Sequence, residues 1–161
     1  MTHIAHSRAV SPAAFVTLML VSGAAGTVAF DLWGQAVAPA LGLGNLSPVG
    51  LARSLLGKLA LPADAAAGSF MHLFLVGLVG YPLGWLLIAR PLLRQILPGL
   101  GWLPASVLYG IGLWVFAIGL IAWFALGQPF LGFARIAWVA LIGHVLYAIA
   151  AAATVLWSER R

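Results

Sequence analysis

Four apolar runs of about 20 residues or more dominate the chain, and they restrict its fold more than any other feature. They extend over residues 13–40, 66–89, 104–126 and 136–157. A helix needs about 20 apolar residues to cross the hydrocarbon core of a bilayer. Charged residues make up only 7% of the chain, whereas soluble domains carry about 25%. The sequence therefore predicts an all-α integral membrane bundle of four transmembrane helices, in a single domain over residues 1–161.

The longest connection, residues 42–65, contains a short amphipathic segment. Between Pro48 and Pro62 the leucines recur at helical spacing, and Arg53 and Lys58 lie off that apolar face. This pattern is typical of a helix that lies in the membrane interface. We therefore expect a short interfacial helix between spans one and two, covering one end of the bundle.

The basic residues set the expected orientation. Four spans place both termini on one side, and the basic residues of that side are Arg8, Arg90, Arg94, Arg160 and Arg161. The other side holds Arg53, Lys58 and Arg135. The positive-inside rule then places both termini in the cytoplasm. The net charge of +5 is scattered along the chain without a basic stripe, so we expect lipid and other membrane subunits as partners, and no nucleic acid.

Polar residues of the spans gather in one half of the bilayer. At a rise of ~1.5 Å per residue, Asp31 lies ~27 Å along the first span, near the non-cytoplasmic face. His72 and His144 lie ~9 and ~14 Å into their spans from that same face. The predicted polar cluster consists of Asp31, Gln35, Arg53, His72, Gln128, Arg135 and His144. Ionisable groups at such depth pair with each other and face the bundle interior or a water-filled cavity.

Within this cluster we expect the carboxylate of Asp31 to pair with Arg53 or Arg135. His72, Gln128 and His144 are expected to line a cavity beneath that pair. The structural alternative is that Asp31 pairs at the interface without a further role, and that each histidine bonds to a backbone carbonyl or a glutamine.

The two histidines also suggest ligation. Two imidazoles on separate helices can bind the iron of a b-type haem, since neutral imidazole nitrogen suits iron. His72 and His144 are therefore candidate haem ligands. A metal site made by Asp31, His72 and His144 is also possible by ligand type. The chain has no cysteine, which excludes thiolate chemistry and disulfides.

The order of several short stretches resembles a family of small bacterial inner-membrane proteins known only as a domain of unknown function. These stretches are "GTVAFDLWG", "LSPVGLARSLLG", "GQPFLGFAR" and "GHVLYAIAA", and the similarity covers most of residues 21–153. Its most specific positions are Thr27, Asp31, Leu32, Trp33, Gly34, Arg53, Gly57, His72, Gln128, Pro129, Gly132, Arg135 and His144. The chain departs from the family pattern in a shorter connection before His72, and in Lys58, where that pattern has a histidine. The resemblance implies a bacterial inner-membrane location and supplies no activity.

No catalytic motif accompanies the polar cluster: the sequence has no phosphate-binding loop, no HExxH, no GxSxG and no second carboxylate inside a span. Small residues such as Gly80, Gly84 and Gly112 suggest close helix packing. We therefore expect a non-catalytic accessory or assembly subunit of a larger energy-transducing or transport complex. One alternative is a protein that handles b-type haem or quinone in electron transfer. The other is a small transporter or proton path.

Overall fold

The computed structural model describes residues 11–160, which form helices and loops and contain no strand. Four of these helices are long and apolar enough to cross a membrane: Pro12–Ala40, Ala65–Ile96, Trp102–Leu126 and Arg135–Glu159. The prediction of an all-α chain with four long apolar helices is thus confirmed. Arg8 and Arg161, on which the expected orientation partly rests, lie outside the described residues.

Three of the four spans consist of consecutive helical segments. The first span joins α1 (Pro12–Leu32), a π-helical segment (Trp33–Val37) and α2 (Ala38–Ala40). The second joins α4 (Ala65–Ser69), a π-helical segment (Phe70–Gly80), α5 (Tyr81–Leu83), a π-helical segment (Gly84–Ala89) and α6 (Arg90–Ile96). The third joins α7 (Trp102–Trp114), a π-helical segment (Val115–Ile121) and α8 (Ala122–Leu126). The fourth is the single helix α9 (Arg135–Glu159).

Prolines account for three of the four π-helical segments. Pro39, Pro82 and Pro91 each lie two residues after the end of such a segment. A proline has no N–H, and its ring collides with the carbonyl four residues earlier in a regular helix. A wider turn before the proline relieves both problems. The second span therefore continues through Pro91 to Ile96, whereas the sequence pattern placed its end at residue 89.

Glycines bring the spans into backbone contact. A Cβ on Gly23 of α1 would lie 2.7 Å from the carbonyl oxygen of Gly77, and one on Gly110 of α7 would lie 2.6 Å from Cα of Val145. These contacts join the first span to the second and the third span to α9. The first span also packs along α9, so the spans follow one another in the order second, first, fourth, third.

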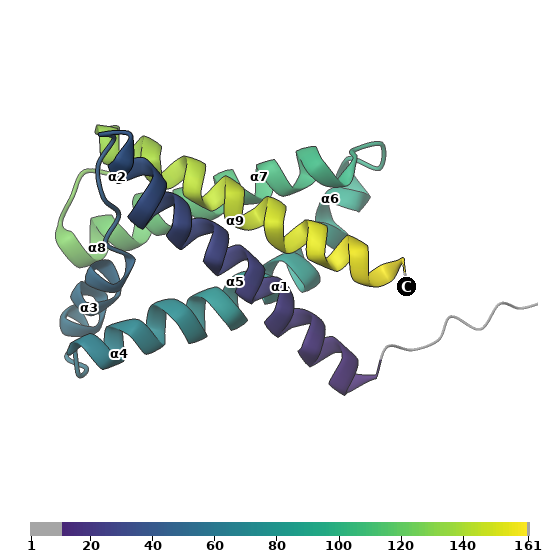
Figure 1. The fold of residues 1–161 in the computed structure, drawn as a ribbon, viewed down its shortest axis with the longest axis horizontal. Coiled ribbons are helices and arrows are strands. Elements are labelled where there is room, and N and C mark those ends of the chain that lie inside the picture. The colour runs from purple at the N-terminus through teal and green to yellow at the C-terminus, as the bar shows by residue number, and fades with distance from the viewer. Residues whose placement is uncertain (1–10, 161) are drawn as a thin grey trace, which may run out of the picture.

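A helix is present at the place where the amphipathic segment was expected. This helix, α3 (Pro48–Lys58), packs against α4 and α8, at the end of the bundle where α2 also lies (Figure 1). A hydrogen bond from the Tyr109 hydroxyl to the carbonyl oxygen of Tyr81 joins the third span to the second. α1 begins and α9 ends at the opposite end from α3 (Figure 1). The bundle therefore has one end covered by α3 and one end that carries both chain ends.

Candidate functional site

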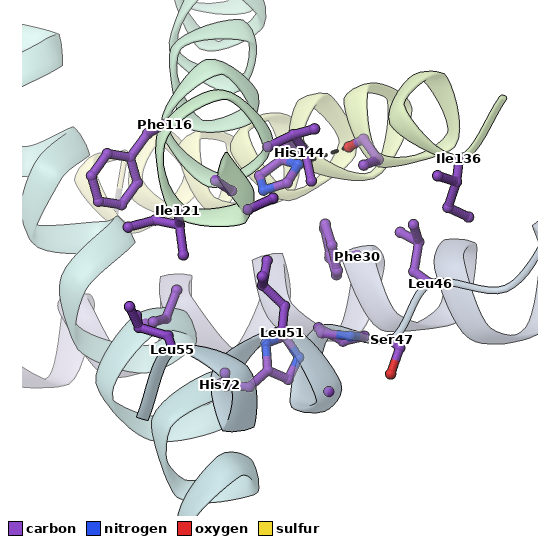
Figure 2. Close-up of a pocket in the computed structure, with 18 of the residues that line it drawn as sticks. Phe30, Leu46, Ser47, Leu51, Leu55, His72, Phe116, Ile121, Ile136 and His144 are labelled. Atoms are coloured by element: carbon purple, nitrogen blue, oxygen red, sulfur yellow. Dashed lines mark hydrogen bonds between the residues drawn. The ribbon is translucent and has the colours of Figure 1, made fainter. Parts of the chain in front are cut away.

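A cavity of about 610 Å³ lies between the spans on the α3 side. Residues from all four spans and from α3 form its wall, and most of them are apolar. In Figure 2, His144 and His72 face this cavity from opposite sides, and Phe30 and Leu51 lie between them in that view. The size and the apolar wall with a few polar groups are those of a small-molecule site.

His144 is held in one orientation by its own helix. Its side chain is 4% exposed, and its Nδ1 lies 2.7 Å from the carbonyl oxygen of Ala140. A carbonyl oxygen only accepts, so Nδ1 carries the hydrogen and donates it. The ring also makes an edge contact with Phe30, at a centroid distance of 4.9 Å. The bond to Ala140 engages Nδ1, so Nε2 is the nitrogen left available on a ring that lines the cavity.

His72 is held by Asp31. Its Nε2 lies 3.0 Å from Oδ1 of Asp31, and the two side chains are 12% and 24% exposed. The amide of Gln35, one helical turn after Asp31, donates to the same oxygen at 2.8 Å. Because a carboxylate oxygen only accepts, Nε2 of His72 carries a hydrogen. Nδ1 is the nitrogen of His72 that has no partner among the described residues.

The expected ion pair between Asp31 and an arginine is wrong. Among the described residues Asp31 pairs with His72 alone. Nε of Arg53 donates instead to the carbonyl oxygen of Ala63, at 2.8 Å, and Arg135 reaches the carbonyl oxygen of Gly42 at 3.5 Å. Both guanidiniums thus hold loop carbonyls beside the helices, where a partly exposed cation keeps its hydration. A histidine on the neighbouring helix meets the carboxylate at lower cost, because it can pair without bringing a permanent charge into the bundle.

The structure divides the predicted polar cluster into two groups. His72, Gln128 and His144 line the cavity, and Gln128 is exposed at its rim. Asp31 bonds to His72, and Gln35 bonds to Asp31, but neither lines the cavity. Arg53 and Arg135 also lie outside the cavity wall.

Two contacts of the histidines bear on haem ligation. First, Phe30 contacts both imidazoles, with centroid distances of 6.1 Å to His72 and 4.9 Å to His144. Second, Nε2 of His72 is already engaged by Asp31. A haem held by both histidines would need Phe30 to move out of the space between them. No group of three His, Asp or Glu residues within residues 11–160 could hold a metal ion. Haem ligation by His72 and His144 stays a prediction.

Sequence reasoning missed two tyrosines. Tyr81 lines the cavity, and its backbone carbonyl accepts the hydrogen bond from the Tyr109 hydroxyl. Tyr147 is 2% exposed, lines the same cavity, and donates to the carbonyl oxygen of Gly77 at 2.6 Å. The sequence signal for the bond between Tyr147 and Gly77 is Pro82, which supplies no N–H to the carbonyl oxygen of Gly77 in the turn that follows it. A carbonyl freed by a proline inside a membrane span needs a donor from a neighbouring helix.

Comparisons with known proteins give no relative for this chain. No family model, no curated protein and no solved structure matches it. The resemblance to the family of small inner-membrane proteins therefore stays a prediction.

Proposed function

We propose that this chain is a multi-pass protein of a bacterial inner membrane that binds a lipophilic molecule with a hydroxyl-bearing head group, of the quinol or phenol class. The binding site is the cavity between the spans, with α3 at the membrane interface as its cover. The chain ends lie on the cytoplasmic side in this proposal, because Arg90, Arg94 and Arg160 lie at that end of the described residues.

The observation that carries the proposal is the pair of imidazoles. Each ring has one nitrogen fixed as a donor, to Ala140 or to Asp31, and the other nitrogen free. In a neutral imidazole that second nitrogen is an acceptor. Two acceptors on the wall of one apolar cavity match a head group that donates two hydrogen bonds, as a dihydroxy aromatic ring does. Because Phe30 contacts both imidazoles, such a ring would reach the two acceptors beside Phe30 and not through the space that Phe30 fills. The ring of Phe30 offers it an aromatic face.

The rest of the wall suits an apolar tail. Leu51 and Leu55 of α3, and Phe116 and Ile121 of the third span, line the cavity and are seen around it in Figure 2. A site that buried only a polar solute would not need this apolar area. Tyr81 lines the same cavity, and its hydroxyl adds one donor for an ether or carbonyl oxygen of the same ligand.

Most of the glycines that suggested an accessory subunit pack within this chain. Gly26 packs under the ring of Tyr147, Gly84 faces the hydroxyl of Tyr109, and Gly119 faces Phe130, all within this chain. Gly112 alone of the glycines in the third span has open space where a Cβ would stand. A role as an accessory subunit stays a prediction.

The proton-path hypothesis finds polar groups along only part of the bundle. Asp31 and His72 connect a partly exposed carboxylate with the cavity. Beyond Tyr109, however, Trp85, Ala105, Ala152 and Val155 form an apolar cluster between the spans. A continuous polar route would have to cross that cluster, so the arrangement favours binding over conduction.

Binding of decylhydroquinone to the purified full chain in detergent tests the proposal. The matched ligand is its dimethyl ether, which keeps the ring and the tail but donates no hydrogen bond. We expect the hydroquinone to bind about 10- to 100-fold more tightly than the ether, the size of two net hydrogen bonds. His144→Leu removes one of the two acceptors and should reduce that difference.

A second pair of variants tests the cavity itself. Ala52 of α3 lines the cavity, whereas Ala24 of α1 is exposed on the outside of the bundle. Ala52→Phe fills the cavity and should abolish binding of both ligands, and Ala24→Phe should not. Equal affinity in the two phenylalanine variants would overturn the proposed site, and equal affinity of the two ligands would overturn the assignment of a hydroxyl head group.

A further inference from the structure

A second cavity lies at the end of the bundle opposite α3. Its volume is about 110 Å³, and its wall includes Trp85, Arg90, Arg94, Trp102 and Ala105. The cavity shares no lining residue with the larger one. Two arginines and two tryptophans around a space of this size distinguish it from a simple packing defect.

The charges at this cavity do not cancel. Arg90 forms two parallel hydrogen bonds with the carboxylate of Glu159, at 2.5 and 2.7 Å. That pair is complete, because the fork of one guanidinium matches both carboxylate oxygens. Arg94 makes no hydrogen bond or ion pair within residues 11–160, although it lies close enough to Glu159 to interact with it electrostatically. One positive charge is therefore left in excess at the wall.

Neutral donors lie at the same wall. Trp85 is 3% exposed, and its Nε1 is the buried side-chain nitrogen that has no acceptor in the part of the chain that the structure describes. An unpaired buried donor costs about 1–3 kcal/mol, so an acceptor at this place would be stabilising. The third span also begins here, at Trp102, and the preceding Gly101 provides no side-chain cap. The free N–H groups of a helix N-terminus favour an anion.

We propose that this cavity binds a phosphate group, contributed by an anionic phospholipid or by a soluble phosphate. Arg94 supplies the charge, and the indole N–H of Trp85 and the first turn of α7 supply neutral donors. Arginines and a tryptophan at the ends of the spans lie at the depth of lipid headgroups, and basic pockets between helices there recognise such groups. The site is independent of the larger cavity and of the function proposed for it.

Thermal unfolding of the full chain in detergent tests the site. The probes are dioleoyl phosphatidylglycerol against dioleoyl phosphatidylcholine, and sodium phosphate against sodium chloride at equal ionic strength. At roughly 100 times Kd, a specific ligand should raise Tm by about 5–10 °C. A rise with phosphatidylglycerol alone identifies the lipid as the source, and a rise with inorganic phosphate identifies a soluble one.

The variants decide whether this cavity is responsible. Arg94→Gln should remove the rise in Tm. The matched control is Arg160→Gln, which removes a positive charge at the same end but not from the cavity wall, and it should keep the rise. Trp85→Phe keeps a six-membered aromatic ring but removes the unpaired N–H together with part of a buried side chain, so the Tm of the ligand-free variant serves as its own baseline, and the rise above that baseline should be reduced. The proposal is overturned if neither probe raises Tm, or if Arg94→Gln and Arg160→Gln lose the rise equally. Should Arg94→Gln fail to fold, an undiminished rise in Trp85→Phe would overturn it.

Discussion

Gly23→Ala tests the closest approach between two spans. The added Cβ would lie 2.7 Å from both the carbonyl oxygen of Gly77 and Cα of Leu78, whereas ordinary contacts of a Cβ are 3.4–4 Å. Both neighbours are backbone atoms, so no rotamer change relieves the collision and the two helices must separate by about 1 Å. Overpacking of this kind costs about 1–3 kcal/mol. The better helix propensity of alanine returns about 1 kcal/mol, which leaves a net loss of about 0–2 kcal/mol.

The matched control is Gly112→Ala. Gly112 lies in α7, and a Cβ there would meet nothing within 4 Å. The same gain in helix propensity then applies without a collision, so we expect unchanged stability or a gain of up to about 1 kcal/mol. The free energy of unfolding, measured by titrating the purified chain with a denaturing detergent, should separate the two variants by the collision cost alone, about 1–3 kcal/mol. If the two variants unfold at the same detergent fraction, the contact between the first and second spans is not as described.

Two further substitutions test contacts of the candidate site. Tyr147→Phe removes the donor to the carbonyl oxygen of Gly77 and should cost about 1–3 kcal/mol of unfolding free energy. Tyr81→Phe removes a hydroxyl from the same cavity wall without breaking that bond and should cost less; equal losses would contradict the assigned bond. Asp31→Asn keeps the shape but removes the charge that strengthens the bonds from His72 and Gln35, and should cost about 1–2 kcal/mol. In double-mutant cycles we expect Asp31→Asn to couple with His72→Gln and not with Arg53→Gln, and the reverse pattern would restore the arginine pair.

The four long helices could be predicted from the sequence because the length of an apolar run follows directly from the thickness of a bilayer. The end of the second span could not be predicted so well. Pro91 and the basic residues around it indicate a break when propensity alone is considered. The structure keeps the helix because the π-helical segment Gly84–Ala89 widens the turn before the proline. Such a widening depends on packing and leaves no pattern in the sequence.

The depth of the site and the cavity residues His72, Gln128 and His144 could be predicted from the sequence, but the partner of Asp31 could not. The rise per residue placed Asp31, His72 and His144 in one half of the bundle, and they do lie near one another around Phe30. The partner of Asp31 depends on how each helix is rotated about its axis, and the hydrophobic pattern of a span that is apolar on every side does not define that rotation. Each π-helical segment changes the rotation further, and His72 itself lies in one.

These irregular segments also explain why the cavity forms where it does. The segment Phe70–Gly80 contributes both His72 and Gly77, and Pro82 leaves the carbonyl of Gly77 without its usual donor in the helix. Tyr147 of α9 supplies that donor, and this bond ties the second span to the fourth at the cavity wall. A chain built for stability alone could have placed a regular helix here, with no proline and no tyrosine to compensate for it. Departures of this kind from local preference, each matched by a specific contact, mark functional sites more often than framework positions. The bond between Tyr147 and Gly77 is therefore independent support for placing the function in the cavity that both residues line.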